Sequence, residues 1–84
     1  MTVAEGLADF VTKALSELSH KSLRQIQFET AMVWYGRAVA AVTLGKQADA
    51  IEYAHESIEH AALSGDNGLL QSIREGLRRN GIAL

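Results

Sequence analysis

Residues 22–44 constrain the fold most, because apolar side chains cover nearly every side of the helix that this run predicts. Three apolar rows with helical spacing can be traced along it. The first row is Leu23, Ile26, Val33 and Ala40; the second row is Ala31, Trp34, Ala38 and Ala41; the third row is Phe28, Met32, Tyr35, Val39 and Val42. A helix of this breadth has to be contacted on several sides, either within the fold or by another molecule. We therefore expect it to be the central helix.

A further helix is predicted ahead of this run. Thr2 followed by Glu5 has the spacing of a capping box, in which each side chain bonds the backbone N–H of the other residue. An apolar row with helical spacing follows, made of Val3, Leu7, Phe10, Val11, Ala14, Leu15 and Leu18. We expect a break at residues 19–21, because Ser22 with Gln25 repeats the capping-box spacing and opens the central run.

Glycines predict where the later helices end, since a residue without Cβ readily takes the left-handed conformation. Gly45 ends the central helix, and a tight turn leads to a helix at about 47–63. Gly65 ends that helix, with Asp66 or Asn67 as the next cap. Gly81 before Ile82 is typical of a Schellman stop after a last helix at about 68–80. With no proline in the chain, we predict one all-α domain over residues 1–84, a compact bundle of three or four helices built on an antiparallel hairpin.

Composition limits the possible functions. At 84 residues the chain is near the size where burial alone gives marginal stability, which favours a homodimer. The absence of cysteine excludes disulfides, thiolate metal sites and a thiol nucleophile. A net charge of -2 argues against a nucleic-acid partner. Glu5 and Asp9 precede any long apolar run, so we expect neither a signal peptide nor a membrane anchor, and a cytoplasmic protein.

Four positions at fixed spacing carry a family resemblance: Trp34, Ala38, Gly45 at the turn and Ala50, with the run AIEY and the small Ser57 after them. On these residues the hairpin 31–62 resembles a single tetratricopeptide repeat. The resemblance implies a hairpin whose first helix lines a groove for partner peptides, through Met32, Tyr35, Val39 and Val42. These residues belong to the third row. We therefore expect the third row, Phe28 included, to bind a protein partner or a second copy, unless another helix of the same chain covers it.

A metal site is the alternative that the sequence leaves open. Glu52 with His55 forms a Glu-x-x-His pair, and Glu56 with His60 lies one turn on. A ferritin-like carboxylate site needs two such pairs and two further glutamates, which this chain reaches only as a dimer that adds Glu29. The runs WYGRA and EHAA are similar to small encapsulated ferritins. Since Ser57 stands where the second pair needs an acid, we favour a solvated acidic face and expect no cofactor.

The remaining motifs predict a protein that is not an enzyme. The sequence has no glycine-rich phosphate loop and no Ser-His-Asp arrangement, and a small all-helical chain has little room for a cleft. Residues 47–66 carry five acids and no lysine or arginine, whereas residues 67–84 carry three arginines against one glutamate. This asymmetry indicates charge-complementary packing or a charged partner. We predict a small adaptor or regulatory module that binds a partner helix or itself.

Overall fold

The computed structural model describes the backbone of residues 3–84 and the side chains of that range except residues 3–8, 18, 20 and 21. Three helices follow one another: α1 (Val3–Thr43), α2 (Gln47–Leu63) and α3 (Asn67–Arg79). The described range contains no strand. The predicted all-α class is therefore confirmed, with three helices.

α1 is continuous over 41 residues, so the break predicted at residues 19–21 is wrong. Serine, histidine and lysine each cost less than about 0.7 kcal/mol relative to alanine inside a helix, so a run of them does not stop one. Ser22 and Gln25 lie in the helix interior, where the Gln25 amide donates to the Glu29 carboxylate at 3.0 Å. The capping box predicted at Thr2 and Glu5 depends on Thr2 and on the Glu5 side chain, which lie outside the part of the chain that the structure describes.

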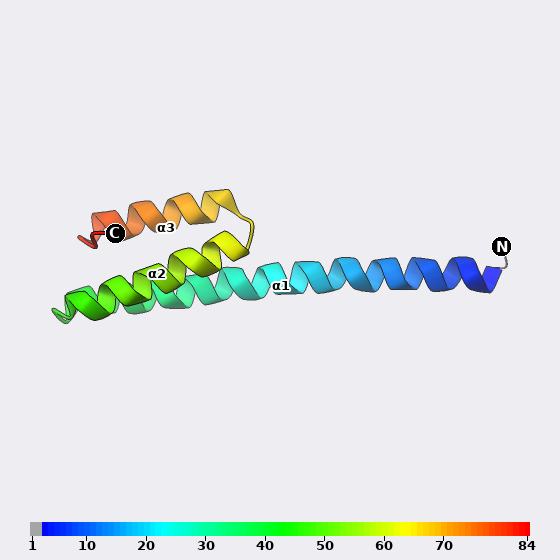
Figure 1. Ribbon diagram of the computed structural model, residues 1–84, viewed down its shortest axis with the longest axis horizontal. Helices are drawn as coiled ribbons and strands as arrows, with labels where there is room; N and C mark the ends of the chain where they lie inside the picture. The colour runs from blue at the N-terminus through cyan, green and yellow to red at the C-terminus, as the bar shows by residue number, and fades with distance from the viewer. Residues whose placement is uncertain (1–2) are drawn as a thin grey trace.

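α2 and α3 fold back on the C-terminal half of α1 only, and the N-terminal half of α1 projects alone (Figure 1). The molecule measures 65 × 18 × 12 Å and its radius of gyration is 18.5 Å, against about 12 Å for a compact domain of this length. The expectation of a compact fold is therefore wrong. At 1.5 Å per residue α1 is about 60 Å long, while α2 extends about 26 Å and α3 less.

α1 and α2 pack through small side chains. The contact contains the fully buried residues Ala31, Ala38, Ala50, Ala54, Ser57 and Ala61. The Ser57 hydroxyl donates to the Ala31 carbonyl at 2.8 Å, so this buried polar group is satisfied. Beside the alanines, the rings of Trp34 and Tyr53 lie 5.6 Å apart. The second row is thus the face of α1 that packs on α2.

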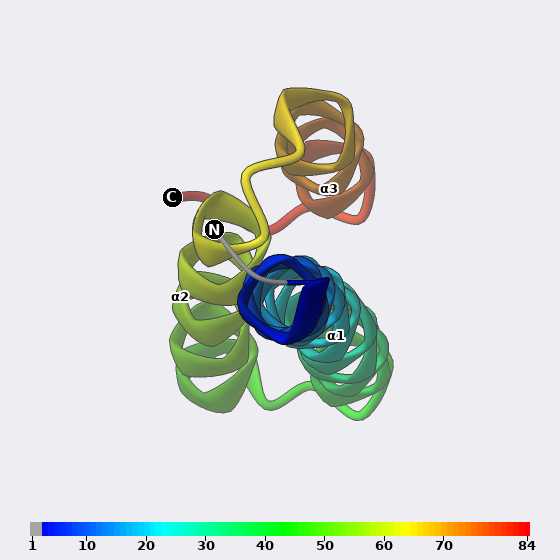
Figure 2. The ribbon, with the colours of Figure 1, turned by 90° about the vertical axis from the view of Figure 1, so that its right-hand side faces the viewer.

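α3 runs alongside α1 and α2 and packs on one side of the pair that they form, as the end view shows (Figure 2). Its inward face is Leu69, Ile73 and Leu77, followed by the buried Ile82. The predicted cap at Asp66 is confirmed, because its carboxylate accepts the Leu69 N–H at 3.0 Å.

The predicted glycine stops are also confirmed. Gly45, Gly65 and Gly81 have φ of 75°, 74° and 78°. The Ile82 N–H bonds the Leu77 carbonyl at 3.0 Å, and the Gly81 N–H bonds the Arg78 carbonyl at 3.0 Å. These two bonds are those of a Schellman motif.

Two helical glycines should respond oppositely to substitution by alanine. A Cβ added at Gly36 meets nothing within 4 Å, whereas one added at Gly76 comes within 2.9 Å of the Tyr35 ring. We expect Gly36→Ala to stabilise the fold by about 0.5–1 kcal/mol, the usual gain in a helix interior. Gly76→Ala should destabilise it, because the Tyr35 ring must move away from α3. Urea denaturation measures both variants, and equal stabilisation would contradict the close approach at Gly76.

Candidate protein interaction surface

The third row lies on the flank of α1 that α3 covers in part. Tyr35 and Val42 are partly buried and pack against the core, and Val39 is also half-buried. Phe28 and Met32 keep 38% and 45% of their surface exposed. The predicted cover by a helix of the same chain is therefore present at the C-terminal end of the row and missing at Phe28 and Met32.

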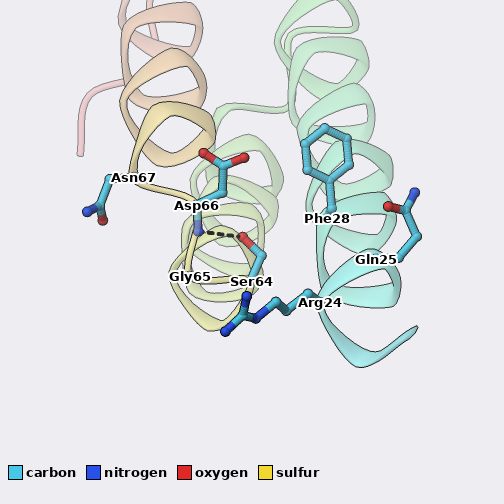
Figure 3. Close-up of a pocket in the computed structure, with 7 residues that line it drawn as sticks. All are labelled: Arg24, Gln25, Phe28, Ser64, Gly65, Asp66 and Asn67. Carbon is cyan, nitrogen blue, oxygen red and sulfur yellow. Dashed lines mark hydrogen bonds between the residues drawn. The ribbon is translucent and has the colours of Figure 1, made fainter. Parts of the chain in front are cut away.

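Two hollows lie beside the open part of this row, one against the turn that joins α2 to α3 and one against α3 itself. The larger, about 530 Å³, is lined by Arg24, Gln25, Phe28 and the turn at residues 64–67. Figure 3 shows the Phe28 ring on α1 facing Asp66 across it. The smaller, about 220 Å³, is lined by Met32, Tyr35, Leu69, Ser72 and Ile73. The two hollows follow each other along α1, beside Phe28 and Met32, so side chains one turn apart on another helix can enter both.

The projecting half of α1 adds further apolar surface. Phe10 and Leu15 are 71% and 59% exposed, and Val11 is exposed as well. The sequence predicts these residues as part of the apolar row of a separate first helix, and the structure leaves Phe10, Val11 and Leu15 exposed on the projecting half of α1. The signal that could have corrected it is the absence of glycine and proline between Leu7 and Tyr35. Because helices in proteins are stabilised mainly by packing of an apolar face, this half needs a neighbour.

The first row is exposed too, at Leu23, Ile26 and Val33. Thr30 and Arg37 interrupt its spacing. The hollow beside the 64–67 turn and the hollow beside Leu69 and Ile73 have Phe28 and Met32 of the third row in their linings instead. The third row is therefore the better candidate for a binding surface, and the first row provides a matched control.

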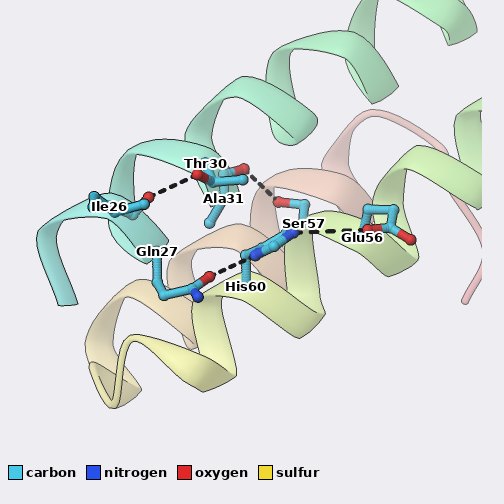
Figure 4. A network of polar contacts seen from close by, with 7 residues as sticks. All are labelled: Ile26, Gln27, Thr30, Ala31, Glu56, Ser57 and His60. Carbon is cyan, nitrogen blue, oxygen red and sulfur yellow. Dashed lines mark hydrogen bonds and ion pairs between the residues drawn. The ribbon is translucent and has the colours of Figure 1, made fainter. Parts of the chain in front are cut away.

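The residues of the alternative metal site do not converge within one chain. Glu52 and His55 are exposed on α2, and Glu29 on α1 accepts from Gln25. His60 Nδ1 donates to Gln27 at 2.5 Å, and its Nε2 lies 3.7 Å from the Glu56 carboxylate (Figure 4). Among the described side chains, no three histidine, aspartate or glutamate residues are placed to hold a metal ion. A site shared between two copies stays a prediction.

Charge contributes little to the packing of α3 on α2. The acid–base contacts between described side chains are Glu75 with Arg79 and Glu56 with His60, the second an ion pair only when the imidazole is protonated, and each joins residues four apart on one helix. Exposed pairs of this kind contribute about 0–1 kcal/mol. Arg74 and Arg78 line a separate hollow of about 620 Å³ with His55 and Ile58 of α2. α3 is therefore held mainly by the apolar contacts of Leu69, Ile73 and Leu77.

No family model, curated protein or solved structure matches this chain. Within residues 3–84, none of the helices has both the length and the apolar character that a membrane span requires.

Proposed function

We propose that the protein is a small, non-enzymatic interaction module that binds a helix along the third row. The bound helix belongs either to another protein or to a second copy of this chain, and we place the module in the cytoplasm. The observation that carries the proposal is the exposure of Phe28 and Met32 beside hollows that α3 leaves open. Contiguous apolar patches of this kind on a small domain mark interaction sites.

The shape of the surface supports a helical ligand. An amphipathic helix binds by laying its apolar residues, spaced three and four apart, into a groove. The third row runs along α1, and the hollow at Met32, which is lined mainly by apolar side chains, provides such a groove. The hollow at Phe28 continues it with a lining that is otherwise mainly polar. The tetratricopeptide-like spacing over residues 31–62 supports the same role, because the equivalent helix face binds peptides in that family. Catalysis would instead need convergent polar groups in a pocket, and the hollow beside Met32 and Tyr35 has Ser72 as the one polar side chain among otherwise mainly apolar ones.

Two neighbouring substitutions on α1 test this proposal. Met32 and Val33 are exposed to similar extents, 45% and 54%, but lie on the third and the first row respectively. We expect wild type to self-associate at micromolar concentrations in light scattering. Met32→Glu should give a folded monomer, because association would bury the new charge. Val33→Glu should associate like wild type, with the same helical circular dichroism.

A hydrophobic dye covers the case of a foreign partner. A monomeric wild type that binds anilinonaphthalene sulfonate, and loses this binding on Met32→Glu alone, would support a docking surface for another protein's helix. If Met32→Glu and Val33→Glu behave alike in both assays, the third row is not the binding surface and the proposal is wrong.

A further inference from the structure

The continuity of α1 joins two apolar rows that a break would have separated. Residues 7, 11, 14 and 18 of the apolar row that begins at Val3 and the residues of the third row lie on one continuous helix. Together they follow a spacing that alternates between four and three residues. The positions are 7, 11, 14, 18, 21, 25, 28, 32, 35, 39 and 42. This spacing is the heptad repeat of a helix that pairs with another helix. We call these positions the seam.

Two polar residues near the middle of the seam determine how two copies can pair. Lys21 and Gln25 are four apart, and the other seam positions are apolar. In an antiparallel pair with 21 opposite 25, position 18 faces 28, 14 faces 32, 11 faces 35 and 7 faces 39. A shift by one heptad in either direction places both polar residues opposite apolar ones. Since a polar seam residue opposite an apolar one is costly, the chain specifies the first register.

The same register matches small residues with large ones. Ala14 faces Met32, and Val11 faces Tyr35, so the smaller partner comes from the projecting half in both pairs. The larger partners line the hollow between α1 and α3. Position 18 faces Phe28, which lines the larger hollow beside the 64–67 turn. Ala14 and position 18 therefore meet the exposed part of the third row, at Met32 and Phe28, whereas Val11 and position 7 meet Tyr35 and Val39, which are half-buried.

A parallel pair would be poorer on the same criteria. Each seam residue would face its own copy, so Lys21 would meet Lys21 and the two charges would repel. Ala14 would meet Ala14, and Met32 would meet Met32, which matches small with small and large with large. The antiparallel register avoids both problems.

We infer that two copies pair through antiparallel α1 helices, the projecting half of each lying along the third row of the other beside α3. This inference rests on the proposed function and names its partner. Each end of the dimer then becomes a bundle of four helices. The projecting half presents Phe10, Val11, Ala14 and Leu15, a face wide enough to contact two neighbours, and α1 and α3 of the second copy supply them. The seam and its flanks over residues 7–39 amount to about 20 residues per copy, the size of a standard protein interface.

Paired cysteines test the register, and the natural chain contains no cysteine. Ala14→Cys with Met32→Cys in one chain should give a covalent dimer on mild oxidation. A disulfide needs Cα atoms within about 7 Å, and these positions lie about 27 Å apart along one helix, so the bond can form only between copies. The control pair Ala14→Cys with Val39→Cys is one heptad out of register and should give little covalent dimer. Ala14→Cys alone should form no covalent dimer under the same oxidation, because the two copies of position 14 lie far apart in the antiparallel register.

Spin labels measure the direction of pairing without forming a bond. Asp9 is exposed and lies on the side of α1 away from the seam. In the inferred dimer it falls opposite position 37 of the second copy, so labels on Asp9→Cys should be about 42 Å apart. A parallel pair would bring them within about 20 Å, two helix diameters.

The outcomes separate this inference from the proposed function. A short label distance with cross-linking of Ala14→Cys alone would overturn the antiparallel register, while loss of association on Met32→Glu would still support the third row as the surface. A wild type that stays monomeric in light scattering would overturn the second copy as occupant, and dye binding would then decide the proposed function. A dimer with neither the 14–32 cross-link nor the long distance would also contradict the inference.

Discussion

Leu77→Ala should lower the free energy of unfolding by about 3 kcal/mol, within the range for a leucine truncated in a core. Leu77 is completely buried and is the largest side chain in that state among those described. It lies on the inward face of α3, and its carbonyl also accepts the Ile82 N–H that ends the helix. A domain of this length has about 4–12 kcal/mol of stability in total, so the loss should be plain in urea denaturation.

Leu63→Ala is the matched control for this substitution. Leu63 is 60% exposed at the end of α2, so the same truncation removes little buried surface and should change stability by less than about 0.5 kcal/mol. Similar losses for both variants would contradict the placement of α3. A loss at Leu77 accompanied by a normal helical signal before unfolding would show that the helices of the variant still form.

Ala54→Leu should destabilise the hairpin by about 2–3 kcal/mol, because a larger side chain cannot enter a filled core without displacing its neighbours. Ala54 is fully buried on the α2 face that packs on the alanines of α1. Ala62→Leu makes the same change at an exposed position of α2 and should be nearly neutral. Thermal unfolding followed at 222 nm compares the two. A neutral Ala54→Leu would mean that α1 and α2 are further apart than the alanine contact implies.

The features that depend on local chemistry could be predicted from the sequence. A left-handed residue is needed where a helix ends in a Schellman motif, and glycine provides it at least cost. Gly45 and Gly81 therefore marked helix ends correctly, and Asp66 marked a helix start. The row of small residues on α1, Ala31, Ala38 and Ala41, could also be traced from its helical spacing, but the spacing does not show that α2 is the helix that packs on it.

The break before Ser22 shows where local chemistry is not sufficient. Ser22 and Gln25 have the spacing of a capping box, but residues three apart inside a continuous helix have that spacing too. Only the path of the backbone distinguishes the two cases, and α1 continues through these residues.

The candidate surface was predictable in part for a related reason. Spacing shows that Phe28 and Met32 belong to an apolar face, but it does not show which neighbour covers them. That depends on how far α3 reaches along α1, and α3 begins at Asn67, across the hollow from Phe28.

The unbroken course of α1 makes the molecule a lever. The hairpin holds one half of the helix, and the other half is an arm of about 20 residues, or roughly 30 Å. Without a hinge, a rotation of the held half is carried to the tip, so a turn of about 10° at the hairpin displaces the end of the arm by about 5 Å. That sideways displacement is about as large as the pitch of one helical turn. Repacking among the alanines between α1 and α2 would therefore change where the distant end of α1 can engage.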